Sequence, residues 1–190
     1  MILNSKVADL FCATKERKRL NQILEKKYSN LYRLAYAWSH QRGLAEDLVQ
    51  ETFLKALENR KDLGSMEYLD AWLAKIMHNQ FLDVMRSNKR WQWTEEKEID
   101  DFYMQESCES TLMDSQESEN IYKAMASLPF EQCESVSLAD LQGFSYQEIS
   151  EITGAPIGTI MSRISRGREA LAQRIKQMEK ASSKIVPLRG

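Results

Sequence analysis

The sequence predicts an all-α protein made of two small helical domains that are joined by a flexible acidic linker. Its 190 residues include only seven Gly and three Pro, fewer than a chain rich in tight β-turns needs. Leu, Glu, Lys, Gln, Met and Ala, which favour helices, are abundant. The acidic and basic residues are unevenly distributed along the chain, and their distribution predicts where the domains begin and end.

Charge divides the chain into three parts. Residues 1–93 hold 16 Lys and Arg against 11 Asp and Glu, residues 94–120 hold one against ten, and residues 121–190 hold nine against seven. The middle part has no hydrophobic period, which is typical of a segment that cannot build a core. The predicted division is an N-terminal extension (1–14), a first helical domain (15–93), an acidic linker (94–120), a second helical domain (121–180) and a tail (181–190).

The first domain contains a strongly amphipathic helix over residues 43–60. One face is predicted to be buried: Ala45, Leu48, Val49, Thr52, Phe53, Ala56 and Leu57. The opposite face carries Asp47, Gln50, Glu51, Leu54 and Glu58. An apolar side chain among carboxylates suits a protein partner with an apolar centre and a basic rim, although a scattered surface leucine is the alternative. A metal site at Glu46, Asp47 and Glu51 is disfavoured, because no histidine converges on them.

A second helix is predicted over residues 69–93, with a core stripe of Leu69, Trp72, Leu73 and Ile76. Its solvent side carries Lys75, Asn79, Arg86, Lys89 and Arg90. Cations interleaved with amide and aromatic groups suit single-stranded or distorted nucleic acid, where phosphates meet the charges and bases meet Asn or ring faces. The lone histidines His40 and His78 are predicted to be structural or surface residues.

The second domain contains two short helices around a tight turn. Ser145 and Glu148 form a capping box, so a helix begins at Ser145. Gly154 offers the left-handed exit that a helix end favours, and Pro156 suits the first position of the next helix. Two helices joined by such a turn predict a helix-turn-helix, with an ordinary αα corner as the alternative.

The second of these helices has two chemically different faces. Ile157, Ile160, Ile164 and Leu171 are predicted to line its buried side, with Gly167 permitting close packing. The outward side carries Thr159, Ser162, Ser165 and Arg166, with Met161 and Arg163 on its shoulders. A short, polar and cationic face suits insertion into a DNA major groove.

Other function classes find no support. Cys12, Cys108 and Cys133 are far apart, so neither a disulfide framework nor a zinc site is indicated. No phosphate-binding glycine loop, HExxH motif or nucleophile elbow occurs, which predicts a protein that is not an enzyme and needs no cofactor or metal. No apolar run is long enough to span a bilayer and no signal peptide is evident, so a cytoplasmic protein is expected.

Together these motifs resemble a bacterial sigma factor of the extracytoplasmic-function (ECF) group of the sigma-70 family. GLAEDLVQETFLKAL is similar to the core of region 2, AWLAKIMHNQFLDVMR to the promoter-reading helix, and SLPFEQCESVSLADLQGFSYQEISEITGAPIGTIMSRISRGREAL to region 4. The chain departs from the family where Met161 replaces a frequent basic residue, Cys133 a frequent arginine and Gly167 a frequent alanine.

The resemblance implies partners. The face with Asp47, Gln50, Glu51 and Leu54 would bind the clamp of the largest subunit of core RNA polymerase, with further contact at the flap. Asn79, helped by the loop from about Asp62 to Tyr68, would recognise a base of the melted downstream promoter element. Ser162, Ser165 and Arg166, with Arg163 near the backbone, would meet the upstream element.

The resemblance also implies regulation by an anti-sigma factor, which is often membrane-anchored. The acidic linker would lie in the RNA exit path of the polymerase, and the free chain would be a monomer. Two rival hypotheses are a conventional helix-turn-helix regulator that binds a palindrome without polymerase, and a protein-interaction adaptor. The adaptor leaves the charge segregation unexplained.

Overall fold

The computed structural model describes residues 22–59, 65–92 and 116–183, together with the side chains of most of them. Every regular element in these ranges is a helix. A first helix covers residues 22–39. The labelled elements that follow are α2 (Arg42–Glu58), the 3-10 turn η2 (Met66–Tyr68), α3 (Leu69–Gln92), α4 (Gln116–Met125), α5 (Phe130–Asp140), α6 (Tyr146–Thr153) and α7 (Ile157–Ser183). The predicted all-α class is confirmed.

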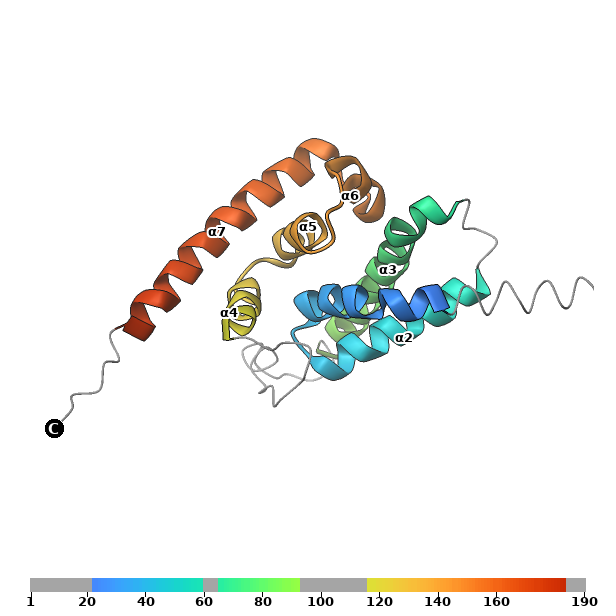
Figure 1. The fold of residues 1–190 in the computed structure, drawn as a ribbon, viewed down its shortest axis with the longest axis horizontal. Helices are drawn as coiled ribbons and strands as arrows, with labels where there is room; N and C mark the ends of the chain where they lie inside the picture. Colours follow the sequence, from blue (N-terminus) through green and yellow to red (C-terminus); the bar gives the residue numbers. More distant parts are fainter. Residues whose placement is uncertain (1–21, 60–64, 93–115, 184–190) are drawn as a thin grey trace, which may run out of the picture.

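The first helix, α2 and α3 form an N-terminal module, as Figure 1 shows. The predicted inner face of α2 is buried at Ala45, Leu48, Val49, Thr52 and Ala56. Leu69 and Leu73 of α3 are buried against it, while Trp72 and Ile76 are only partly buried. A 2.7 Å ion pair from Lys27 to Asp70 joins the first helix to the start of α3.

The C-terminal module consists of α4 to α7, in which α4, α5 and α6 all pack on α7 (Figure 1). The helix α4 begins at Gln116, inside the segment that was predicted to be linker. A 2.6 Å ion pair from Lys123 to Glu119 lies along this helix, and Tyr122 and Met125 are buried. The first helix of this module therefore begins earlier in the chain than the charge pattern indicated.

One glycine of this module faces a neighbouring helix at close range. Gly167 of α7 faces Val136 of α5, and a Cβ atom at Gly167 would lie 2.6 Å from Cγ2 of Val136. Backbone oxygen O of Gln132 would lie 3.3 Å away. The prediction that Gly167 permits close packing is confirmed.

The two modules are packed against each other, so that their buried residues form one continuous core. Helices α5 and α6 lie between α7 and α3 (Figure 1). Phe130 of α5 contacts Trp38 of the first helix and Phe81 of α3, with ring centroids 6.3 and 5.0 Å apart. This packing was not predicted, because it depends on residues that are far apart in the chain.

Candidate protein and nucleic-acid interfaces

The outward face of α2 is solvent-exposed as predicted. Asp47, Gln50 and Glu51 are all exposed, and the side chain of Leu54 leaves 56% of its surface accessible. Burying the accessible part of this side chain against a partner contributes roughly 1 to 2 kcal/mol, since about half of its surface is already buried. The face thus combines an apolar anchor with a rim of carboxylates, which is the chemistry expected for a partner with a complementary basic rim.

The outward face of α3 carries the expected polar groups. Lys75, Asn79 and Arg86 are exposed and fall on one side of the helix, since they are four and seven residues apart. Arg86 donates a 3.0 Å hydrogen bond to Asp83, so part of its charge is balanced on the same surface. The side chains of Lys89 and Arg90, which were predicted to join this face, lie outside the described residues.

Two exposed apolar residues precede α3 and were not singled out by the sequence patterns. Met66 and Tyr68 of η2 are 50% and 61% exposed. Ser65 positions this turn, because its Oγ accepts a hydrogen bond from the Glu67 backbone N at 3.3 Å. The part of the predicted loop before Ser65, residues 62–64, lies outside the described residues. Large exposed side chains before the start of α3 would suit stacking against unpaired bases.

The helix-turn-helix of the C-terminal module has the predicted geometry. The side chain of Ser145 accepts from the backbone N of Glu148, and the Glu148 carboxylate accepts in return from the backbone N of Ser145 at 2.8 Å. Gly154 adopts a left-handed conformation with φ of 72°. Ser150 Oγ donates to the Ala155 carbonyl at 2.7 Å, which further fixes the turn. The capping box and the glycine exit are confirmed.

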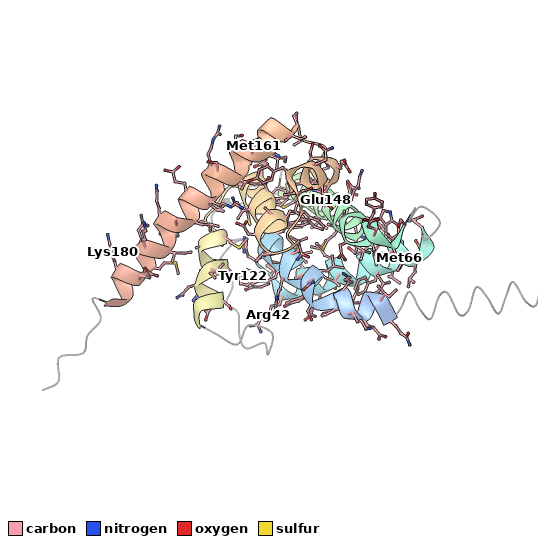
Figure 2. All side chains as sticks on the ribbon, turned by 45° about the horizontal axis from the view of Figure 1, so that its top comes forward. Arg42, Met66, Tyr122, Glu148, Met161 and Lys180 are labelled. Atoms are coloured by element: carbon pink, nitrogen blue, oxygen red, sulfur yellow. The ribbon has the colours of Figure 1, made fainter. Side chains whose placement is uncertain are left out.

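The outward face of α7 is centred differently from the prediction. Met161, Ser165 and Arg166 are exposed, whereas Thr159, Ser162 and Arg163 are half-buried. Ser162 Oγ also donates to the Thr159 carbonyl at 2.9 Å. Met161, which was expected on a shoulder, lies on the exposed side near the N-terminal end of α7 (Figure 2).

The expectation for Ile157 was wrong. It was predicted to join the buried stripe with Ile160 and Ile164, which are indeed buried, but its side chain is 40% exposed. The physical reason is position: Ile157 is the first residue of α7, where no preceding helical turn covers it. Pro156 lies just before the helix, and its carbonyl accepts from the backbone N of Thr159 and of Ile160.

Several buried polar contacts join the two modules, and we call this set the module interface. Trp38 Nε1 donates to Ser137 Oγ at 2.9 Å, and Cys133 Sγ donates to the Ala37 carbonyl at 3.1 Å. The Glu134 carboxylate accepts from His78 Nδ1, and both side chains are buried. His78 is therefore structural, as predicted, but its partner lies 56 residues away in the other module. Burial raises the pKa of the Cys133 thiol to about 12, which keeps it protonated.

The described residues contain neither a group that could bind a metal ion nor a helix that could span a membrane. Among those residues, no three His, Cys, Asp or Glu side chains are grouped so that they could hold an ion. Within the same part of the chain, no helix combines the length and the apolar character that crossing a bilayer demands.

Comparison with known proteins identifies both modules. Residues 23–91 match the model of Sigma-70 region 2, and residues 118–171 match that of Sigma-70, region 4. The chain is 34% identical over 144 residues to the ECF RNA polymerase sigma factor EcfG of Rhodopseudomonas palustris, covering 75% of this chain and 77% of that relative. The chain belongs to the ECF group of the sigma-70 family.

Two other relatives extend the comparison. The ECF RNA polymerase sigma factor SigE of Mycolicibacterium smegmatis is 34% identical over 153 residues, which is 80% of this sigma factor but 59% of that longer relative. The solved structure of the sigma factor RpoE from Bartonella quintana, in complex with the anti-sigma factor NepR, is similar with a TM-score of 0.73 and 32% identity. That match covers 84% of this chain and 98% of the Bartonella chain. Members of the family are initiation factors rather than enzymes.

Proposed function

We propose that this ECF sigma factor binds core RNA polymerase through α2, directs it to a small set of promoters and assists their melting. The observation that carries the proposal is the presence of three separate exposed faces with different chemistry. The α2 face combines Leu54 with carboxylates, the α3 face combines Lys75 with Asn79, and the α7 face combines Ser165 with Arg166. These chemistries suit a protein clamp, unpaired bases and a duplex major groove, respectively.

An anti-sigma factor is the second proposed partner. The similar Bartonella sigma factor was solved in complex with an anti-sigma factor, and that likeness spans most of both chains. The exposed Leu54 is a suitable anchor for such a partner as well, because an apolar residue ringed by charge is what an inhibitor must cover to exclude polymerase. The two partners would then compete for one face.

The packed arrangement of the modules is proposed to be the resting form of the protein. In the polymerase complex, the linker would lie in the RNA exit path, with one module at either end of it. The module interface must then open when both modules are bound. Free protein would bind promoter DNA weakly, because the packed modules are held at one fixed separation instead of the one that a promoter requires.

Run-off transcription with core polymerase tests the function. Templates with the promoter should yield a discrete transcript only when both core enzyme and this protein are added. A gel shift with the same duplex, with and without core enzyme, separates the rival helix-turn-helix regulator, which would bind a palindrome unaided. Tight, salt-sensitive binding by the protein alone, with no transcript from the complete mixture, would show that the proposal is wrong.

A further inference from the structure

Two exposed apolar residues form a pair at the start of α7. Ile157 and Met161 are four residues apart, so they lie side by side on one face of the helix. They are 40% and 53% exposed, and both therefore offer apolar surface to solvent. Figure 2 shows Met161 near the N-terminal end of this helix, away from the α4 end of the module.

The surroundings of the pair favour DNA as its partner. Ser165 is exposed one turn further along the same side of α7, which adds a hydrogen-bonding group, and the exposed Arg166 next to it adds a cation to the solvent face of the helix. Between the two apolar residues lies Gly158, where a Cβ atom would meet nothing within 4 Å. This leaves bare backbone beside the pair and allows the start of the helix to approach a surface closely. Cationic and hydroxyl groups suit phosphates and base edges.

We infer that Met161, supported by Ile157, recognises the methyl group of a thymine in the upstream promoter element. The 5-methyl group of thymine is the apolar group that a base pair presents in the major groove, and apolar side chains contact it. A methionine is long and flexible enough to follow the position of such a methyl group. The inference rests on the proposed function, because it assumes that α7 enters the major groove of promoter DNA.

A basic residue in place of Met161 would recognise a different base pair. An arginine there would favour a guanine, through hydrogen bonds to O6 and N7. A methionine makes no such bonds, so the favoured base pair changes from G·C to one with thymine. Met161 is therefore a specificity-determining residue, and its substitution should alter which promoters are used more than how tightly polymerase is bound.

The test removes only the methyl group. Holoenzyme, formed from core polymerase and this protein, first selects active promoters from templates with a randomised upstream element. Each thymine of the selected element is then replaced by deoxyuridine, and open complexes are counted. With the natural protein, one or two replacements should reduce open complexes about fourfold, equivalent to about 0.8 kcal/mol for one buried methyl group.

Three variants complete the experiment. With Met161→Ala, the thymine and deoxyuridine templates should give equal numbers of open complexes. With Met161→Arg, a repeated selection should enrich guanine in place of that thymine. The matched control Ile121→Ala, at an apolar residue of α4 that is 42% exposed, should keep the fourfold effect of the methyl group.

The outcomes separate the inference from the function on which it rests. If scrambling the whole upstream element leaves transcription unchanged, α7 does not recognise the promoter and the proposed function itself is overturned. If the element matters but deoxyuridine is neutral everywhere, or Met161→Ala keeps the methyl effect, the inference alone is overturned. If Met161→Ala weakens binding to core polymerase without changing base preference, the apolar pair contacts protein and the inference is likewise overturned.

Discussion

Leu54 is the residue on which the proposed polymerase contact depends most. Leu54→Glu would place a fourth carboxylate at the centre of the exposed α2 face and remove its apolar anchor. We expect the affinity for core polymerase to fall at least about thirtyfold, because central interface residues contribute about 2 kcal/mol or more. Binding to the anti-sigma factor should weaken as well. Surface plasmon resonance with each partner measures both effects.

The control for this substitution is Ile121→Glu, since Ile121 is a similarly exposed apolar residue on α4. It should leave both affinities within twofold of the natural protein. Undiminished binding of the Leu54→Glu variant to both partners would show that the α2 face has been assigned to the wrong role.

His40 should make the fold sensitive to mild acid. His40 is half-buried, and its partial removal from solvent lowers its pKa to about 4, from an ordinary value near 6.5. Below about pH 6.5, His40 binds a proton in the unfolded chain, whereas in the folded chain it binds one only below about pH 4. The free energy of unfolding therefore falls as the pH drops through this window. The backbone φ of His40 is 52°, a conformation that Asn also tolerates.

His40→Asn should therefore remove this acid sensitivity without backbone strain. Between pH 7 and pH 4.5, the natural protein should lose on the order of 2 kcal/mol more stability than the variant. Urea unfolding at several pH values measures the difference, and the groups that titrate in both proteins cancel. If the free energies of unfolding of the two proteins followed parallel pH profiles, a half-buried His40 that stays neutral in the fold would be contradicted.

At the scale of elements, the packing of α5 on α7 depends on the absence of a side chain at Gly167. Gly167→Ala gains helix propensity of about 1 kcal/mol, but its Cβ would lie 2.6 Å from Cγ2 of Val136. Val136 is β-branched and has little rotamer freedom in a helix, so we expect a net loss of about 1 to 3 kcal/mol of stability. Thermal and urea unfolding measure it.

A second substitution tests the cause. Val136→Ala removes the clashing methyl group, so the double variant Gly167→Ala/Val136→Ala should be less unstable than the two single effects predict. Gly158→Ala is the matched control, because nothing lies within 4 Å of the added Cβ. It should stabilise α7 by about 0.5 to 1 kcal/mol. If the two single effects were simply additive in the double variant, contact with Val136 would not be the reason why Gly167→Ala loses stability.

The elements differ in how far local sequence predicts them. The faces of α2, the capping box at Ser145 and the turn at Gly154 follow from interactions within a few residues, and each was predicted. The helix α5 carries no such pattern, because the buried residues Cys133, Glu134 and Ser137 are small or polar. Their partners lie 96, 56 and 99 residues away in the other module. No local period could have placed them in a core.

At the scale of the whole molecule, the chemistry of the module interface makes it suited to opening. Beside the aromatic contacts of Phe130 with Trp38 and Phe81, this interface buries the pair His78 and Glu134 and several small polar residues, which a purely apolar core would not contain. Such groups are stable in the packed form when they are paired, and they are solvated without penalty when the modules separate. The charge pattern correctly indicated two modules. It carries no information about whether the two modules pack together, because that depends on the residues of the module interface.

A substitution at Cys133 can shift the equilibrium between packed and separated modules. It is buried at the module interface, and its Sγ faces the Ala37 carbonyl of the first helix. Cys133→Arg would bury an unpaired charge in the packed form at a cost of about 3 to 5 kcal/mol. We expect the modules to separate, which small-angle X-ray scattering would detect as a radius of gyration larger by several ångströms. Promoter-dependent transcription with core polymerase should be retained or increased.

The matched variant Cys133→Ser keeps the size and the hydrogen bond of the natural residue, so its scattering should be unchanged. Circular dichroism tells two failures apart. A Cys133→Arg variant that loses helical content would show that Cys133 supports the fold of its own module instead of the contact between modules. A variant with full helical content and an unchanged radius of gyration would show that the packed arrangement tolerates the charge, and that the module interface does not control opening.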